Sequence, residues 1–562
     1  MKLKKTTTQG NRICFWGVAI LATVFRLVLT EGLMVCFMSG TQYDDIMQIG
    51  KAFSIGGGSW LGEYGPMTLV KGVGYPLLTA IFHWLKIPYV LGFHLIYVTG
   101  CVAFAWAIRP VVKNRLLFLT AYFFVLFNPV AFSASLTRYY RDIAYYAVCM
   151  VFIALMLGLL IRQRGKAAAA AAGFWLAVCI LCREDGQWLY IYAVACVLAI
   201  LLYRSITDKK PYLTFWKELL CMVAAYACVI LCICGINYKY YKTFTVDEYN
   251  SGAYAEAYGA LSRLHGEEGN TQVVIPYAER QKLYEYSPSF ARLQPFLDGN
   301  DPRFEGWKIV KDDYRTGYFS FNLRDMISAL GYYKDAPSTN LYLTQLANEV
   351  NEYCDTVSEN AYRKRSTIVS RFYPEHIPQI ALSTLDAMRA TVTYTNISCI
   401  PLQCEEDDTY LQIFESFTRS TVAANRYMES GEIVENYHLT GFARWMQRAM
   451  RVLILIYQTI APVLFCIAVL YLIFQTVMLL RKYTERRFVC WIAGQSLLAL
   501  FLLRSFMIGY VDATSYSAAQ TVSYLAASHA VLGCFIALQL SGLLSDLATK
   551  KKNRSVTPKQ SA

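Results

Sequence analysis

About ten apolar runs, each close to the length of a membrane-crossing helix, are spread over this sequence of 562 residues. A helix needs roughly 20 apolar residues to cross the hydrocarbon core of a bilayer. Because backbone N–H and C=O groups must be paired inside that core, separate apolar runs can cross it only as helices. The composition agrees, with 56% hydrophobic and 15% aromatic residues and a mean hydropathy of +0.32. The sequence therefore predicts a polytopic α-helical membrane protein.

The charged residues between these runs predict how the chain crosses the membrane. The formal net charge is +13, and Lys and Arg gather in short segments between apolar runs, as they do on the cytoplasmic side of membrane proteins. This distribution argues against a nucleic-acid partner and places both termini in the cytoplasm. The expected spans lie at about 13–38, 88–109, 115–134, 142–161, 166–182, 187–204, 214–238, 447–480, 487–509 and 519–545.

Two shorter apolar pieces, 44–55 and 75–85, lie in the first loop of the chain at 39–87. The second would be only about 17 Å long as a helix, which is too short to cross a bilayer. Counting it as a crossing would also move the following Lys and Arg clusters to the outside. We therefore expect two interfacial helices in a large first outer loop.

The spans predict four parts of the chain. Residues 1–238 would form an N-terminal transmembrane catalytic module, and residues 239–446 an extracytoplasmic domain of mainly helical structure. Residues 447–546 would hold the last transmembrane helices, and residues 547–562 a basic cytoplasmic tail. Within the outer domain, helices are expected near 251–265, 278–286, 338–355 and 420–435.

Most of the 17 cysteines lie inside apolar runs, where they behave as small hydrophobic residues. Three lie in the polar domain: Cys354, Cys399 and Cys404. A disulfide among these three is open, because the sequence alone does not fix a pairing. No Cys and His residues show the spacing of a zinc site.

The first outer loop begins with a pair of carboxylates, Asp44 and Asp45, directly after Tyr43. An aspartate here can be a general base for an incoming hydroxyl or amine, or a metal ligand. It can equally be an N-cap that stabilises the following helix. The sequence alone leaves both readings open, and it does not say which of the two aspartates would act.

Three later segments carry charges that suit a phosphate or a sugar. The turn Lys71-Gly72-Val73-Gly74-Tyr75-Pro76 combines a cation with glycines that permit close backbone approach. Arginine side chains can bind phosphate oxygens with two hydrogen bonds. Clusters of charge at helix ends in membrane proteins usually line a cavity. The two further segments are Arg138-Tyr139-Tyr140-Arg141-Asp142 and Arg183-Glu184-Asp185-Gly186.

Taken together, the order and spacing of these motifs resemble the GT-C superfamily of membrane glycosyltransferases, which includes the protein O-mannosyltransferases and the lipid A aminoarabinose transferase. The resemblance covers roughly residues 10–240 and is strongest to bacterial proteins with YDD, LAKGPGYPL and TREEG motifs. It implies a GT-C-type bundle and an active site outside the cytoplasm, in the bacterial cytoplasmic membrane. Val73 departs from the pattern, because a proline is common at that position in the family.

The resemblance also implies an inverting transfer from a polyprenyl-phosphate sugar donor to an envelope glycan, lipid or protein. Asp44 or Asp45 would be the base, and Tyr43 and Tyr75 would contact donor or acceptor. A divalent metal, Mg²⁺ or Mn²⁺, is left open. The donor phosphate would be held by Lys71, Arg138, Arg141 and Arg183. The sugar or a metal would be held by Asp142, Glu184 and Asp185.

Two other functions are compatible with the same charges. A transporter or flippase of lipid-linked sugars would use them as a substrate pathway, although the chain lacks the internal repeats common in transporters. A non-catalytic envelope assembly protein would keep a degenerate site. The identity of the sugar, the acceptor and the prenyl chain does not follow from the sequence.

Overall fold

Helices make up nearly all the regular structure in the computed structural model of the chain. It describes residues 2–38, 40–163, 165–207, 212–249, 251–264, 273–299, 301–305, 308–310, 313–314, 316–358, 361–402, 404–427, 433–434 and 440–556. Within these residues, nine stretches are helical, long and apolar enough to cross a membrane. The chain is therefore a polytopic, mainly α-helical membrane protein, as the apolar runs predict.

Nine of the ten expected spans correspond to these nine stretches. The span expected at 166–182 is a helix over those residues, but its 17 residues fall at the short end of the spanning range. The apolar helices in the ten expected regions are α1 (Lys2–Val28), α4 (Tyr89–Ile108), α5 (Arg115–Leu126), α7 (Asp142–Arg162), α8 (Lys166–Cys182), α9 (Trp188–Thr207), α10 (Tyr212–Tyr241), α20 (Gly441–Arg481), α21 (Glu485–Thr514) and α22 (Val522–Val556).

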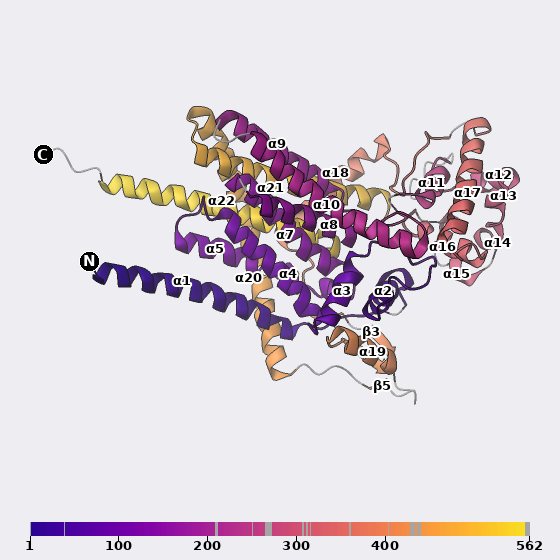
Figure 1. Cartoon of the computed structure of the whole chain (residues 1–562), viewed down its shortest axis with the longest axis horizontal. Helices are drawn as coiled ribbons and strands as arrows, with labels where there is room; N and C mark the ends of the chain where they lie inside the picture. Colours follow the sequence, from indigo (N-terminus) through magenta and orange to yellow (C-terminus); the bar gives the residue numbers. More distant parts are fainter. Residues whose placement is uncertain are drawn as a thin grey trace.

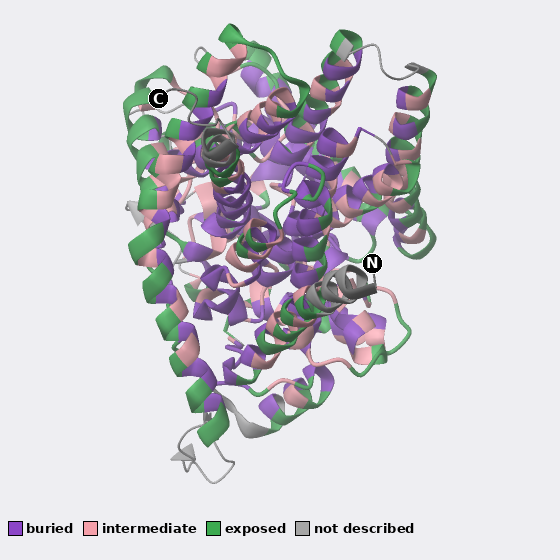
Figure 2. Cartoon of the chain, turned by 90° about the vertical axis from the view of Figure 1, so that its left-hand side faces the viewer, coloured by how far each residue is buried: buried purple, intermediate pink, exposed green. Residues whose placement is uncertain are grey.

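Helix α7 forms the centre of the bundle, and 94% of its most apolar window is buried inside the protein. It packs against α4, α8, α9, α21 and α22. A helix that is apolar on all sides must be surrounded by other helices or by lipid, and α7 is surrounded by helices. Figure 2 shows the buried residues concentrated in the middle of the molecule and the exposed residues on the outer faces of the helices.

Glycines let some of these helices approach closely. A Cβ at Gly100 of α4 would meet the Met150 side chain of α7 at 2.7 Å, and a Cβ at Gly173 of α8 would collide with the Met222 carbonyl of α10. Small residues at such contacts let the helix backbones approach closely, which is a common way for helices to associate in membranes.

The first loop, between α1 and α4, contains two short helices that correspond to the expected interfacial ones. The turn η2 (Gln42–Ile46) leads into α2 (Met47–Gly56), and α3 (Gly74–Trp84) precedes α4. Two polar residues of α2, Gln48 and Lys51, are also buried inside the protein. The other short helices near this loop are η1 (Leu29–Gly32), η3 (Pro129–Phe132) and α6 (Ala134–Thr137).

The residues between α10 and α20 divide their buried side chains between two places. Residues from Tyr249 to Cys354 share a hydrophobic cluster, whereas Tyr394, Phe414 and Val422 join the main cluster of the bundle. The elements of this part are α11 (Ala253–Leu261), α12 (Tyr277–Tyr286), α13 (Pro288–Ala291), α14 (Gln294–Leu297), α15 (Pro302–Glu305), β1 (Lys308–Val310), β2 (Asp313–Tyr314), α16 (Thr316–Ala329), α17 (Ala336–Thr356), η4 (Pro374–His376), α18 (Ile377–Thr393), β3 (Cys404–Asp407), α19 (Asp408–Thr418), β4 (Ala424–Tyr427) and β5 (Ile433–Val434).

Helices α11, α12 and α17 confirm three of the helices expected in this part. The helix expected near 420–435 is wrong, because this segment contributes β4 and β5 instead. Strand β4 pairs in parallel with β3 and antiparallel with β5. This pairing with distant residues overrides the local helical preference.

The start of α1 and the end of α22 lie at one end of the molecule in Figure 1, and α11 to α17 lie at the opposite end. Helices α2 and α3 lie between that far part and the long helices.

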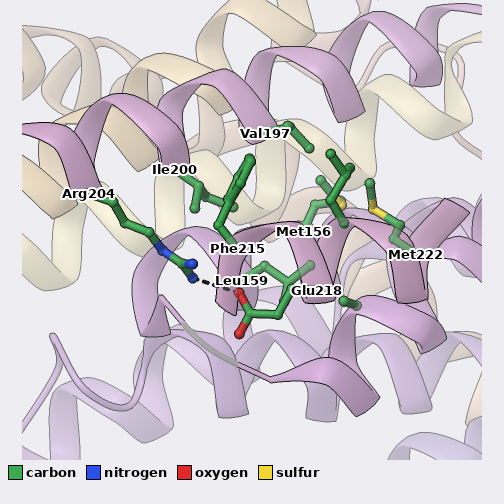
Figure 3. A pocket seen from close by; sticks show the side chains of 10 residues that line it. Met156, Leu159, Val197, Ile200, Arg204, Phe215, Glu218 and Met222 are labelled. Carbon is green, nitrogen blue, oxygen red and sulfur yellow. Dashed lines mark hydrogen bonds and ion pairs between the residues drawn. The ribbon is translucent and has the colours of Figure 1, made fainter. Parts of the chain in front are cut away.

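One buried ion pair lies at the end of the bundle where α7 finishes. Arg204 of α9 lies 2.6 Å from Glu218 of α10 and donates at 2.8 Å to the Gln163 carbonyl, while the Gly165 N–H donates to Glu218 at 2.9 Å. The pair borders a cavity of about 30 Å³ lined mainly by apolar side chains (Figure 3). It therefore ties α9 and α10 to the turn between α7 and α8.

Candidate functional site

Two adjacent residues after α1 connect the first loop to distant segments. Val35 and Cys36 form isolated parallel β-bridges, Val35 with Val422 and Cys36 with Arg138. The carbonyl of Cys36 accepts a hydrogen bond of 2.7 Å from the backbone N–H that follows Arg138. These bonds fix the backbone of Arg138 beside the loop that carries the two aspartates.

Asp45 is fully buried and is held from two sides. Arg138 donates from Nε and Nη2 to Oδ1 of Asp45 at 2.9 and 2.6 Å, and the Met38 N–H donates to Oδ2 at 3.0 Å. Burial raises the pKa of Asp45 to about 6, and the donors from Arg138 and Met38 limit the rise. Asp45 is therefore ionised at neutral pH, and it anchors Arg138.

Asp44 has the same charge but a different environment, since 34% of its side chain is exposed. Its Oδ1 lies 2.6 Å from Lys71 Nζ and its Oδ2 lies 3.4 Å from Arg138 Nη2. Burial alone would raise the pKa of Asp44, but Lys71 and Arg138 hold it at about 2. Asp44 is thus the member of the pair that a ligand can reach.

Lys71 is almost completely buried, and its ammonium group donates hydrogen bonds to three oxygen atoms. Nζ donates to the Tyr43 carbonyl at 2.6 Å, to Asp44 at 2.6 Å and to the Tyr140 hydroxyl at 2.9 Å. Burial lowers the pKa of Lys71 to about 8, although the charge of Asp44 opposes the change. Behind it, Lys51 donates to the Lys71 carbonyl at 3.1 Å, and burial lowers the pKa of Lys51 to about 7.

Three cations surround the ring of Tyr140. Lys71 Nζ lies 5.1 Å from the ring centroid, and the guanidinium carbons of Arg138 and Arg141 lie 5.3 and 5.2 Å from it. A cation over an aromatic face is stabilised by the negative face of the ring. Tyr140 therefore helps to hold three like charges close together.

Arg141 and Glu184 join the second and third charged segments. Arg141 Nη1 pairs with Glu184 Oε2, and Glu184 Oε1 accepts the Gly72 N–H at 2.9 Å. Burial would raise the pKa of Glu184, but Arg141 and the Gly72 N–H hold it below its ordinary value. Glu184 thus connects the turn after α8 to the Lys71-Gly72 backbone of the first loop.

A chain of alternating charges completes the arrangement. Arg183 contacts Asp142 at 2.5 Å and Asp185 at 2.9 Å, and Arg504 of α21 contacts the other oxygen of Asp185 at 3.0 Å. Arg183 and Arg504 are buried, whereas 38% of the Asp185 side chain is exposed. The two arginines lower the pKa of Asp185, against the effect of burial. We refer below to one charged cluster, formed by Asp44, Asp45, Lys71, Arg138, Arg141, Asp142, Arg183, Glu184, Asp185 and Arg504.

The two tyrosines expected to contact donor or acceptor differ. The Tyr43 hydroxyl donates to Asp325 of α16 at 2.5 Å. Tyr75 is fully buried, bonds the Tyr89 hydroxyl at 2.9 Å and stacks on Phe93. Tyr75 therefore packs inside an aromatic group and does not offer its side chain to a ligand, contrary to our expectation.

Helix α16 covers the first loop beside the charged cluster. Phe321 lies over both Tyr43 and Lys71, with centroid distances of 4.6 and 5.3 Å. Three residues further along, Arg324 pairs with Glu248 at 2.5 Å, and Glu248 accepts a hydrogen bond from the first loop. One face of α16 thus forms a wall next to Asp44.

The structure brings together the charged residues of all four sequence segments. Sequence reasoning missed Arg504, Lys51 and Asp325. The signal for Arg504 was an arginine within an apolar span, which is costly in a membrane and usually functional. Lys51 lies on a short amphipathic helix and gave no distinguishing signal.

The carboxylates suggested as metal ligands are engaged in ion pairs. Asp142, Glu184 and Asp185 each pair with at least one arginine. Among the described residues, no group of three or more His, Cys, Asp or Glu side chains is arranged to hold a metal ion. Guanidinium groups therefore contact all three of the carboxylates suggested as metal ligands.

The cysteines considered for a disulfide remain unlinked where they are described. Cys354 and Cys399 are both free and buried, and Cys354 belongs to the outer hydrophobic cluster while Cys399 belongs to that of the bundle. The side chain of Cys404 lies outside the described residues.

No protein-family model and no curated protein matches the chain. Two solved structures of ArnT from Cupriavidus metallidurans align with most of it. The apo structure has 12% identity and a TM-score of 0.28, over 94% of this chain and 78% of that one. The structure bound to undecaprenyl phosphate has 13% identity and a TM-score of 0.29, over 93% and 78%. At these TM-scores the alignments carry no information about the charged cluster.

Proposed function

We propose that this chain is a GT-C-type membrane glycosyltransferase. It transfers a sugar from a polyprenyl-phosphate carrier to a cell-envelope acceptor, with inversion at the anomeric carbon. The reaction takes place at the outer face of the bacterial cytoplasmic membrane, and both termini lie in the cytoplasm. Asp44 is the base that receives the proton of the acceptor.

One observation carries this proposal: the partly exposed Asp44 lies in a cluster with cations from three other charged segments. Lys71 and Arg138 contact it directly, and Arg141 and Arg183 lie in the same network. A lipid-linked donor needs cations for its phosphate at the membrane surface and a base near its sugar. Both requirements meet at the exposed edge of Asp44.

The cations would stabilise the leaving phosphate in two ways. Arg138 keeps 24% of its side chain exposed, so its guanidinium can contact phosphate oxygens. Lys71, Arg141 and Arg183 are more deeply buried and already paired, so they act mainly through their charge. Fixed charges that need no rearrangement are the main source of stabilisation for developing negative charge in enzymes.

In the proposed reaction one bond forms and one bond breaks at the anomeric carbon. The acceptor oxygen or nitrogen forms a bond to the anomeric carbon while the bond from that carbon to the phosphate oxygen breaks. The acceptor proton passes to Asp44, and the polyprenyl phosphate leaves with the electron pair.

Donor binding would also prepare Asp44 for its role. Lys71 and Arg138 hold the pKa of Asp44 at about 2, which makes it a weak base. A bound phosphate places negative charge near the same two cations and so offsets their effect on Asp44. The pKa of Asp44 then rises toward the range in which proton transfer is efficient.

The remaining carboxylates have supporting roles. Asp45 positions Arg138, Asp142 positions Arg183, and Glu184 positions Arg141. Asp185 also pairs with arginines, but its exposed oxygen edge can accept hydrogen bonds from sugar hydroxyls. Tyr43 and Phe321 line the same side and can contact the donor sugar or the acceptor.

The test uses purified protein in lipid nanodiscs with a radiolabelled polyprenyl-phosphate sugar and an envelope extract as acceptor. The wild type should release polyprenyl phosphate, and Asp44→Asn should retain donor binding but lose turnover. A transporter would instead move label across sealed vesicles without cleaving the donor, and that result would exclude the transferase. Asp386→Asn, which changes an exposed aspartate on α18, is the matched control.

A further inference from the structure

A second cavity, which is polar, lies in the part of the protein that is distant from the start of α1 and the end of α22. It has a volume of about 420 Å³ and is lined by residues near α13, by the turn between α16 and α17, and by α17 itself. These elements lie at the right-hand end of Figure 1. The volume falls within the range of small-molecule sites in proteins, about 300–1,000 Å³.

The lining of this outer cavity is cationic. Arg292 comes from the end of α13 and Lys334 from the turn before α17, and no acidic side chain is among the lining residues. Both are exposed. Two carboxylates lie near the outer cavity without lining it: Glu349 accepts hydrogen bonds from the Ser287 and Ser289 hydroxyls, and Asp335 accepts the Ser338 N–H at 2.8 Å. The outer cavity therefore favours an anion.

The aromatic and neutral polar residues of the outer cavity suit a sugar ring. Tyr332 and Tyr342 are stacked with ring centroids 4.1 Å apart, and the Tyr332 hydroxyl accepts a hydrogen bond from Arg292. Ser338 and Gln345 add hydroxyl and amide groups to the lining. Aromatic rings pack against the C–H faces of sugars, and hydroxyl and amide groups bond their hydroxyls.

The outer cavity is also connected to the charged cluster through one turn. Tyr332 lines the cavity, whereas the next residue, Tyr333, stacks on Tyr64 of the first loop at 5.9 Å. The Tyr333 hydroxyl accepts a hydrogen bond of 3.0 Å from Arg324 of α16, the helix that covers the first loop. Tyr332 and Tyr333, which are adjacent in the chain, thus link the outer cavity to α16 and to the first loop.

From these observations we infer that the outer cavity binds an anionic saccharide unit, a sugar that carries a carboxylate or a phosphate, in the acceptor glycan. Its use as an acceptor site rests on the proposed glycosyltransferase activity, whereas the binding itself does not. Arg292 and Lys334 pair with the anionic group, and the tyrosine pair supports the ring.

The experiment measures binding to the full-length protein in nanodiscs without any donor lipid. The probes are tetragalacturonate, a hexose monophosphate and neutral maltotetraose, and binding is followed by ligand-observed NMR and thermophoresis. The two anionic probes show whether carboxylate or phosphate is preferred. We expect an anionic probe to bind more tightly than maltotetraose, with an affinity that falls as salt is added.

The variants test the assigned residues. Arg292→Gln should weaken binding about tenfold, as expected for the loss of one charge-assisted hydrogen bond. Lys334→Glu reverses an exposed charge and should abolish binding while the melting temperature is retained. Lys282→Gln removes the same charge from α12, away from the cavity, and should bind like the wild type. Equal binding of neutral and anionic probes, no binding of either anion, or unchanged binding by Lys334→Glu would overturn the inference.

Two further outcomes separate the alternatives. Tighter binding of an acidic peptide than of either anionic sugar would assign the outer cavity to a protein partner and overturn the saccharide. If the wild type fails to cleave a polyprenyl-phosphate sugar, the proposed transferase activity is wrong, but the inferred saccharide binding is not affected.

Discussion

The guanidinium of Arg504 lies 3.0 Å from the carboxylate of Asp185, although the two residues are 319 positions apart in the chain. Arg504 also donates to the Tyr524 carbonyl at 3.3 Å, and the ring of Trp188 lies 5.3 Å from its guanidinium carbon. The last membrane helices are therefore joined directly to the loop that holds Arg183. This contact makes the C-terminal helices part of the charged cluster.

Replacement of Arg504 should impair turnover although the proposed base, Asp44, is unchanged. We expect Arg504→Gln to lower kcat more than it raises KM for the donor, because Asp185 would then shift relative to Arg183. A double-mutant cycle with Asp185→Asn should give a coupling energy of about 0.5–3 kcal/mol. The exposed arginine Arg448 provides the matched control as Arg448→Gln. Additive effects of the two changes would show that the contact has no energetic role.

The pH dependence of kcat/KM should be bell-shaped. On the acid side the rate falls as pH drops through about 6, because Asp45 takes up a proton and Arg138 loses its charged partner. On the alkaline side it falls as pH rises through about 8, because Lys71 loses its proton. Asp44 stays ionised across this range, since its pKa is about 2.

The variant Lys71→Arg shows which lysine causes the fall of kcat/KM at alkaline pH. Lys51 has a pKa lowered by burial to about 7 and could produce a similar limb. Arginine stays protonated at any accessible pH. Lys71→Arg should therefore remove the limb near pH 8 if Lys71 causes it, and should leave a limb near pH 7 if Lys51 does.

The glycine after Lys71 should tolerate no side chain. A Cβ at Gly72 would collide with the Leu181 carbonyl of α8, and the Gly72 N–H donates to Glu184. Gly72→Ala should separate the loop from α8 and lower activity at least tenfold, with a lower melting temperature. A Cβ at Gly65, in the same loop, meets nothing within 4 Å, so Gly65→Ala should behave like the wild type. Both variants are compared by thermal unfolding and by donor cleavage.

The buried pair of Arg204 and Glu218 allows a stability test far from the charged cluster. Glu218→Gln leaves a buried arginine without its counter-charge, and breaking a buried pair on one side costs about 3–5 kcal/mol. The double variant Arg204→Met with Glu218→Leu removes both charges and should recover most of the loss. Thermal unfolding in nanodiscs measures both, and a double variant as unstable as the single one would contradict this account.

Removal of divalent metals provides a further check. Because arginines occupy Asp142, Glu184 and Asp185, donor cleavage should persist after treatment with EDTA. Loss of cleavage that returns on addition of Mg²⁺ or Mn²⁺ would show that these carboxylates rearrange to hold a metal.

The sequence was a good guide to the helices and to the charged segments. Apolar length alone predicts α4, α7, α9 and α10 within a few residues, because a membrane imposes that length. The charged residues of the short segments between spans also lie together, as expected, since charge is costly in lipid.

Long-range packing could not be predicted from the sequence. The difference between Asp44 and Asp45 depends on which oxygen Arg138 reaches, and Arg138 is placed by a bridge to Cys36. The segment near 420–435 has local helical preference, yet its partner strand β3 makes it a strand. Tyr75 carries a hydroxyl typical of a binding loop, but aromatic neighbours from α4 bury it.

The most direct measurement of the central claim is donor cleavage by Asp44→Asn and Asp45→Asn, each compared with Asp386→Asn. Loss of a general base typically lowers kcat about 10²–10⁴-fold. We predict that decrease for Asp44→Asn with donor binding and melting temperature retained, and a reduced melting temperature for Asp45→Asn. An Asp44→Asn protein that cleaves the donor at the wild-type rate would contradict the account.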